Sequence, residues 1–231
     1  MNKTASYGLL ITLEGIEGVG KSTQLSFVER YLRKKNIPVL VTREPGGTAI
    51  AEAIRHLVLH AEVTCDEPLA PEAELLLFFA ARVQHIQQII QPALLRGDWV
   101  ICDRFVEASY AYQGGGRGID PSFISSLQQW IQPVLTIDCV LWLDAPVSLV
   151  MQRIKHRRLD RIEAESTAFF ERVRRVYQLR AEQKKAAYHH IDASRTKAEV
   201  QAQISQVLDQ LIEHSGCIRH PPNNQLLSHG N

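Results

Sequence analysis

The residues best suited to chemistry stand near the start of the chain, in the segment GIEGVGKST at positions 15–23. It matches the pattern G-x-x-x-x-G-K-[ST], whose glycines let the backbone curl until its N–H groups converge on phosphate oxygens. Lys21 would neutralise the terminal phosphates, and the hydroxyl of Ser22 would ligate Mg²⁺. The segment therefore predicts a nucleoside triphosphate site. The residues expected to bind ATP are Gly15, Ile16, Glu17, Gly18, Val19, Gly20, Lys21, Ser22 and Thr23.

A second group of charged residues follows two of the apolar segments: Arg43 comes after one, and Asp103 with Arg104 after another. In an open α/β sheet the ligand crevice lies outside the carboxyl ends of the strands. Two basic side chains there could grip a second anionic group opposite the phosphate loop. Asp103 could act through Mg²⁺ or its water, or steer the acceptor phosphate. We expect Glu17 to face this second substrate, because a carboxylate beside triphosphate oxygens costs Coulomb energy.

The elements that must position these residues show in the apolar patterning. Five short runs rich in Val, Ile and Leu alternate with longer stretches whose apolar residues recur at helical spacing. Because the runs are continuously apolar, they indicate strands buried on both faces of a parallel sheet, so the expected fold is α/β with flanking helices. The strands are expected at 9–13, 38–41, 99–102, 140–143 and 189–191, and the helices at 21–34, 72–95, 121–131, 146–156 and 166–188.

Residues at the boundaries support several helices. Asp120 and Pro121 suit the N-cap and first position of a helix, and Thr196 with Glu199 has the pattern of a capping box. The glycine-rich stretch 114–118 is expected to be a loop, because it is too flexible to continue the preceding helix.

Length and composition fit one compact domain. The chain has 231 residues, 45% of them hydrophobic; we expect residues 1–215 to form one domain and 216–231, which lack periodicity, a disordered tail. The formal net charge of +1 gives no global field for nucleic acid or anionic membranes. The four cysteines form no C-x-x-C pair and are expected to be reduced. No segment approaches the ~18 apolar residues of a membrane span. We therefore expect a cytoplasmic protein without nucleic-acid or membrane partners.

An ordered set of motifs resembles thymidylate kinases from about Gly8 to about Gln210. It consists of GIEGVGKST at 15–23, TREPGGT at 42–48, LLLFFAARVQ at 75–84, DRF at 103–105, SYAYQGGGRGID at 109–120 and LDRIEAES at 159–166. The phosphate loop alone is generic, but the ordered set is highly specific. The resemblance implies a P-loop kinase fold with a lid segment, transfer of the γ-phosphoryl group of ATP to dTMP with Mg²⁺, and a homodimer.

The resemblance also implies roles for single residues. Arg43 and Arg104 would hold the dTMP phosphate, and Asp103 would be the catalytic carboxylate and a metal ligand. Phe78 would stack on the thymine ring while Arg82 bonds its exocyclic oxygen; these two residues are four apart and so share one helix face. Phe79, by contrast, is expected to be a core residue.

The remaining acceptor contacts implied by the family lie close together in the chain. Ser109 would lie near the base edge, and Gln113 would also contact the substrate. Tyr112 would occupy the space of a ribose 2′-hydroxyl, which favours deoxy substrates. In related enzymes with an acid in the phosphate loop, that acid reaches the 3′-hydroxyl of dTMP, and Glu17 is its counterpart here.

Four arginines, Arg153, Arg157, Arg158 and Arg161, surround the stretch where related kinases carry a mobile lid. Family members whose phosphate loop lacks an arginine place arginines in the lid, and this phosphate loop has none. Such groups would stabilise charge on the transferring phosphoryl oxygens, and Arg153 and Arg157 are the expected catalytic members. A solvated basic helix face is the alternative interpretation.

Other functions share the phosphate loop. The strongest alternative is another nucleoside monophosphate kinase or a deoxynucleoside kinase. A nucleotide-dependent switch protein would need a base-reading N-K-x-D motif, which is absent from the sequence, and would leave the acceptor-side arginines without a role. A nucleic-acid ATPase would need a long basic track, which the near-zero net charge does not offer.

Overall fold

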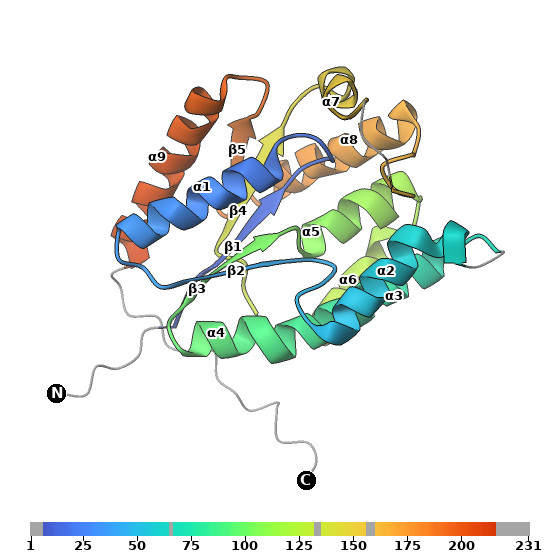
Figure 1. Ribbon diagram of the computed structural model, residues 1–231, viewed down its shortest axis with the longest axis horizontal. Helices are drawn as coiled ribbons and strands as arrows, with labels where there is room; N and C mark the ends of the chain where they lie inside the picture. Colours follow the sequence, from blue (N-terminus) through green and yellow to red (C-terminus); the bar gives the residue numbers. More distant parts are fainter. Residues whose placement is uncertain (1–6, 65–66, 132–134, 156–159, 216–231) are drawn as a thin grey trace, which may run out of the picture.

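The computed structural model describes residues 7–64, 67–131, 135–155 and 160–215. Its centre is a single five-stranded parallel sheet in the order β2-β3-β1-β4-β5 (Figure 1). This confirms the predicted strands and their parallel arrangement. The strands are β1 (Leu10–Glu14), β2 (Val39–Arg43), β3 (Trp99–Asp103), β4 (Cys139–Asp144) and β5 (Tyr188–Asp192).

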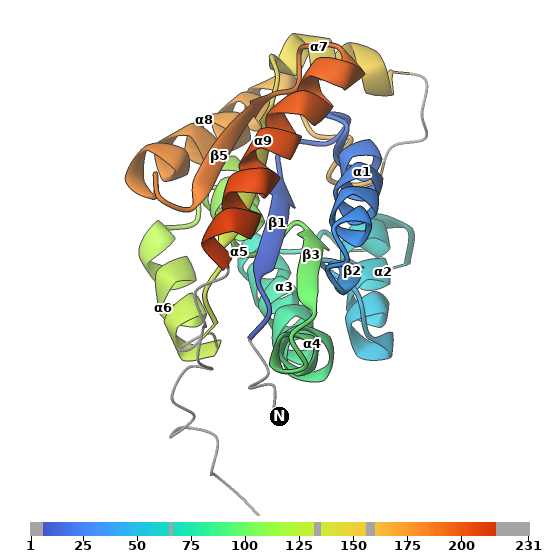
Figure 2. The same cartoon turned by 90° about the vertical axis from the view of Figure 1, so that its left-hand side faces the viewer.

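Helices cover both faces of the sheet (Figures 1 and 2). Helices α1 (Lys21–Lys34) and α9 (Lys197–Ser215) pack against each other on one face, and α8 (Thr167–Gln183) lies on the other. The remaining helical elements are α2 (Ala49–Thr64), α3 (Pro71–His85), the π-helix η1 (Ile86–Ile90), α4 (Gln91–Leu95), α5 (Val106–Ser109), the π-helix η2 (Tyr110–Gly116), α6 (Pro121–Ile131) and α7 (Val147–Ile154).

Local sequence signals explain several helix starts. The Asp120 carboxylate accepts a hydrogen bond from the backbone N–H of Ser122 at the start of α6, at 2.8 Å. Thr196 and Glu199 form the predicted capping box: the Glu199 carboxylate accepts from the Thr196 N–H at 2.9 Å, and Thr196 Oγ1 accepts from the Glu199 N–H at 3.4 Å. Side-chain acceptors thus satisfy N–H groups that a helix start leaves unpaired.

The prediction of a loop at 114–118 is wrong for its first part, because Gly114, Gly115 and Gly116 complete η2. These glycines allow close packing against α8. A Cβ on Gly115 would lie 2.6 Å from Val176 Cγ2, and one on Gly116 would lie 2.4 Å from Phe169 Cε2. Glycine is needed here for space rather than for flexibility.

Two helix boundaries also differ from expectation. The helix expected at 166–188 ends at Gln183, because the chain turns there and enters β5 at Tyr188. The stretch expected to form one helix at 72–95 is α3, η1 and α4 in succession, so its extent is right but its middle is wider than an α-helix.

Burial is greatest in the inner strands of the sheet. Every residue of β1 and β4 is buried, as expected for the inner strands of a parallel sheet covered on both faces. Cys102 and Cys139 are free, buried thiols, while Cys65, Cys217 and the tail at 216–231 lie outside the described residues. Within the described part of the chain, no helix is long and apolar enough to cross a membrane.

Candidate active site

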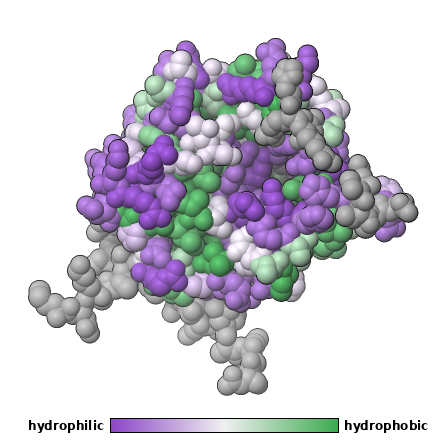
Figure 3. Space-filling model, viewed as in Figure 1, coloured by the Kyte–Doolittle hydropathy of each residue, from purple (hydrophilic) through white to green (hydrophobic). Residues whose placement is uncertain are grey.

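The carboxyl ends of β1, β2 and β3 open into a pocket of about 430 Å³. Figure 3 shows it as a hollow lined largely by hydrophilic residues. The phosphate loop forms one wall, and residues from α2, α3, α5 and η2 form the opposite wall. The pocket therefore lies where an open parallel sheet is expected to bind ligands.

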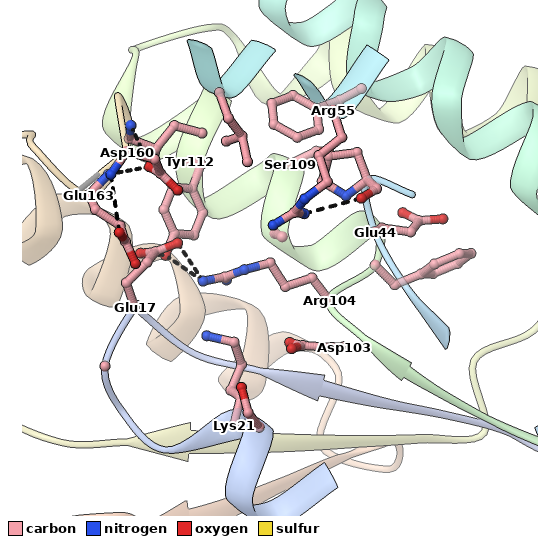
Figure 4. Close-up of a pocket in the computed structure, with 18 of the residues that line it drawn as sticks. Glu17, Lys21, Glu44, Arg55, Asp103, Arg104, Ser109, Tyr112, Asp160 and Glu163 are labelled. Atoms are coloured by element: carbon pink, nitrogen blue, oxygen red, sulfur yellow. Dashed lines mark hydrogen bonds and ion pairs between the residues drawn. The ribbon is translucent and has the colours of Figure 1, made fainter. Parts of the chain in front are cut away.

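Lys21 projects into this pocket from the first turn of α1 (Figure 4). Its ammonium group donates to the carbonyl oxygens of Gly15 at 3.1 Å and Ile16 at 3.0 Å, so the loop itself holds the side chain. Burial, followed by the nearby charge of Arg104, lowers the pKa of Lys21 to about 8. A poorly hydrated ammonium group of this kind gains most when an anion arrives.

The phosphate loop has the backbone that close anion binding requires. Gly20, at the N-cap of α1, has φ of 108°, and no side chain caps the helix start. The first N–H groups of α1 therefore remain available for phosphate oxygens. Of the predicted loop residues, Glu17, Gly18, Gly20, Lys21, Ser22 and Thr23 line the pocket, whereas Gly15, Ile16 and Val19 lie behind it.

Asp103 ends β3 and faces Lys21 across the pocket floor (Figure 4). Its Oδ1 is buried, and no described residue gives it a hydrogen bond. Ser22 is exposed on the first turn of α1. No group of three or more His, Cys, Asp or Glu that could hold a metal occurs among the described residues. Mg²⁺ in nucleotide sites needs only one or two protein ligands besides phosphates and water. Ser22 and Asp103 therefore fit a Mg²⁺ ion that arrives with a nucleotide.

Glu17, Arg104 and Tyr112 meet on the acceptor side of the pocket (Figure 4). Arg104 Nη2 donates to Glu17 Oε1 at 2.5 Å and to the Tyr112 hydroxyl at 3.1 Å, and the Tyr112 hydroxyl also donates to Glu17. Burial alone would raise the pKa of Glu17, but Arg104 and Lys21 outweigh it and lower that pKa. Glu17 is therefore an ionised carboxylate turned away from the first helical N–H groups.

Arg82, on α3, lines the wall opposite the phosphate loop and is almost fully buried, at 2% exposure. It donates from Nε to Glu44 at 2.7 Å and from Nη1 to the Ser109 hydroxyl at 3.1 Å. Phe78, one turn earlier on α3, also lines the pocket. Phe79 is buried in the core, which confirms that expectation, and its ring lies 4.7 Å from the Arg82 guanidinium carbon.

The structure does not bring Arg43 into the pocket. Its side chain is 54% exposed and pairs with Glu52 at 3.0 Å. Arg55, which sequence reasoning missed, lines the pocket instead and donates to the carbonyl of Pro45 at 3.1 Å. Burial and the nearby Arg43 lower the pKa of Arg55. Arg55 was missed because the sequence analysis did not predict helix α2, which carries it.

The two lid-region arginines that the structure describes, Arg153 and Arg161, are placed differently. Arg153, on α7, lines the pocket and donates to the carbonyl of Ala193 at 3.2 Å. Arg161 donates instead to the carbonyl of Val58 at 2.9 Å and to the buried carboxylate of Glu74. It is thus tied to the scaffold rather than to the pocket. Arg157 and Arg158 lie outside the described residues.

Ser109, Tyr112 and Gln113 all reach the pocket from one continuous helical segment, α5 and η2. The Gln113 amide donates to Glu74 Oε1 at 2.8 Å, which holds this side chain against α3. The same Glu74 carboxylate receives the Arg161 guanidinium. The structure therefore gathers the sequence-predicted acceptor residues around one pocket, with Arg43 as the exception.

Comparison with known proteins agrees with this geometry. The family model described as thymidylate kinase matches residues 13–204. A thymidylate kinase from Methylococcus capsulatus is 51% identical over 206 residues, which cover 89% of this chain and 97% of that protein. One from Ectopseudomonas mendocina is 50% identical over 207 residues, with 89% of this chain and 97% of that protein covered.

A solved structure also resembles this fold. The crystal structure of thymidylate kinase from Ehrlichia chaffeensis is similar to this one, with a TM-score of 0.72 and 32% sequence identity. The match covers 88% of this chain and 99% of that one. The chain therefore belongs to the thymidylate kinase family, and it is an enzyme that phosphorylates dTMP.

Proposed function

We propose that the pocket carries out this reaction with ATP as the donor and Mg²⁺ as the cofactor. Lys21 and the first N–H groups of α1 hold the donor phosphates, and Ser22 and Asp103 hold Mg²⁺, which when bound offsets charge on the transferring oxygens. The pairing of Lys21 with the orphaned Asp103 oxygen in one pocket supports this assignment. Arg153, on the same pocket, supplies further positive charge toward the transferring phosphoryl group.

The acceptor half of the proposal rests on two further arginines that line the pocket. Arg104 and Arg55 are cations without a donor-side role, and they hold the dTMP phosphate in place of the expected Arg43. The single observation that carries the two-substrate mechanism is that these arginines and Lys21 line the same pocket. A second anionic group can therefore meet the donor phosphate there.

The rest of dTMP extends along the wall formed by α3, α5 and η2. Phe78 offers its ring to the thymine, and Arg82, Ser109 and Gln113 present polar groups to the base edge. Tyr112 blocks the position of a ribose 2′-hydroxyl, and Glu17, which accepts a hydrogen bond from Tyr112, contacts the sugar. Specificity for the deoxy sugar thus comes from exclusion, and specificity for the base from hydrogen bonds.

A panel of acceptors tests this function. With ATP and Mg²⁺, we expect kcat/KM for dTMP to exceed the values for UMP, dCMP, AMP and GMP by at least about 10²-fold, because a wrong base leaves buried donors and acceptors unpaired and Tyr112 excludes a ribose 2′-hydroxyl. The value for dUMP should fall by only about 10-fold, since dUMP lacks one methyl group. A coupled ADP-release assay measures all six. Equal use of AMP or GMP would contradict the assignment.

We also propose that the enzyme is a cytoplasmic homodimer. The outer face of α6 exposes Phe123 at 66% and Trp130 at 79%, and these residues are seven apart, on one side of the helix. Large apolar side chains gathered on one surface are typical of a protein interface. In sedimentation velocity we expect a dimer that Trp130→Glu converts to monomer, while Glu72→Lys on the exposed start of α3 serves as a charge-change control. A monomeric unmodified protein would contradict the proposal.

A further inference from the structure

The residue Arg104 stands at a strained corner just after β3. Its φ of 67° lies in the left-handed region, which costs an ordinary residue about 1–2 kcal/mol. Both peptide N–H groups around its Cα are held by β1: the Arg104 N–H donates to the Leu13 carbonyl at 3.0 Å, and the Phe105 N–H donates to Glu14 Oε1 at 2.8 Å. For the Phe105 N–H, the Glu14 side chain thus takes the place of a backbone carbonyl of the sheet as the acceptor.

The Arg104 guanidinium has two differently occupied ends. Nη2 points to Glu17 and Tyr112 at the acceptor side of the pocket. Nη1 instead donates to the Gly15 carbonyl at 2.8 Å and makes a longer contact of 3.5 Å with the Tyr177 hydroxyl. The Nη1 end is therefore anchored to the scaffold, and the Nη2 end is left facing the acceptor.

The anchor continues from Tyr177 back to Glu14. The Tyr177 hydroxyl donates to Glu14 Oε2 at 2.8 Å, and both side chains are fully buried. Neither residue lines the pocket. One carboxyl oxygen of Glu14 thus accepts from the backbone at the Arg104 corner, and the other accepts from the tyrosine that touches the Arg104 guanidinium.

We propose that Glu14 and Tyr177 are positioning residues for Arg104, which hold its corner and its guanidinium in the orientation that receives the acceptor phosphate. This inference rests on the proposed role of Arg104 in holding dTMP. Glu14 makes no contact with substrate in this arrangement; it acts only through Arg104.

The physical cost of keeping this carboxyl group supports a role beyond packing. Burial raises the pKa of Glu14 to about 8, even though Arg104 and the Tyr177 hydroxyl act to lower it. A buried carboxyl group is therefore held in an environment that disfavours its charge, and an apolar side chain of similar size would fill the same space without that penalty. Its two hydrogen bonds to described residues go to the Phe105 N–H at the Arg104 corner and to Tyr177, which touches Arg104.

Kinetics on Tyr177→Phe and Glu14→Gln test the proposal. Tyr177→Phe removes only the hydroxyl, while Glu14→Gln keeps an oxygen for the Phe105 N–H but removes the acceptor for Tyr177. We expect each to raise the KM for dTMP about tenfold, since a small misplacement of a phosphate-binding group is costly. The KM for ATP should stay within about twofold, because Arg104 faces the acceptor.

Tyr188→Phe is the matched control. Its hydroxyl also donates to a buried carboxylate, that of Glu107, at 2.5 Å, but it has no contact with Arg104. We expect this variant to lose stability without a change in the KM for dTMP. If all three variants change the KM for dTMP equally, the effect is one of general destabilisation and the inference is overturned.

A double-mutant cycle with Arg104→Ala separates this inference from the proposed function. If Arg104→Ala leaves dTMP kinetics unchanged, the proposed role of Arg104 itself fails. If Arg104→Ala is impaired, Tyr177→Phe should add nothing in that background, because it acts only through Arg104. A full additional tenfold effect there, or no effect of Tyr177→Phe in the unmodified enzyme, would overturn the positioning role. Tyr177→Phe decides the matter should Glu14→Gln fail to fold.

Discussion

Replacing Lys21 with alanine is expected to lower kcat by about 10²-fold or more while the protein stays folded. The ammonium group sits at the root of the phosphate loop, held by the carbonyls of Gly15 and Ile16, and faces the pocket. Its charge is needed most when negative charge builds on the transferring phosphoryl oxygens, so its loss falls on the transition state. Single-turnover measurement at saturating ATP and dTMP gives the change directly.

The control is Lys35→Ala just after the same helix, where the side chain is 47% exposed and pairs with Asp209. It should keep normal kcat, and circular dichroism should show both variants folded. Arg153→Ala is a useful comparison, because it should also lower kcat with little change in the KM for dTMP. A folded Lys21→Ala enzyme with near-normal turnover would show that the phosphate loop does not bind the donor as proposed.

The sheet and its flanking helices could be predicted because buried strands leave a strong signal. All residues of β1 and β4 are buried, and their unbroken apolar runs are visible in the sequence. Helix α2 was missed although the sequence carries a signal for it. Ile50, Ile54, Leu57 and Val58 recur at helical spacing. The helix packs chiefly on α3 rather than on the sheet, and Ala51 and Val58 are its buried apolar residues in the part whose burial is described.

Site residues could be predicted where the end of a strand fixes their position, but not where the direction of a side chain decides whether it reaches the pocket. The residues after β1 and β3 reach the pocket because strand ends converge there. Along β2, Thr42 bonds His85 and the following Glu44 bonds Arg82, so both face α3. Alternation along an extended chain then turns Arg43 the other way, toward Glu52. The motif alone does not reveal that alternation, nor that Arg55 rather than Arg43 lines the pocket.

Replacing Arg82 with alanine is expected to have two separable effects. The Arg82 and Glu44 side chains are only 2% and 3% exposed, so the variant takes the arginine away from a buried carboxylate and leaves it with the His85 imidazole, at 3.2 Å. Loss of one member of such a pair costs about 3–5 kcal/mol. We therefore expect the free energy of unfolding to fall by roughly that amount, and Tm to fall by roughly 10 °C. Thermal and urea unfolding measure this part.

The second effect concerns the acceptor base. Hydrogen bonds to charged groups contribute about 1.5–3 kcal/mol, so the KM for dTMP should rise about tenfold or more in the folded variant, while the KM for ATP stays nearly constant. Arg180→Ala is the matched control, because Arg180 pairs with another buried carboxylate, Glu107, at 2.6 Å, outside the pocket lining. It should lower stability but leave the KM for dTMP unchanged. Both variants lose an arginine from a buried ion pair. If Arg82→Ala raises the KM for dTMP and the KM for ATP equally, and Arg180→Ala does the same, Arg82 supports the fold and does not bind the base.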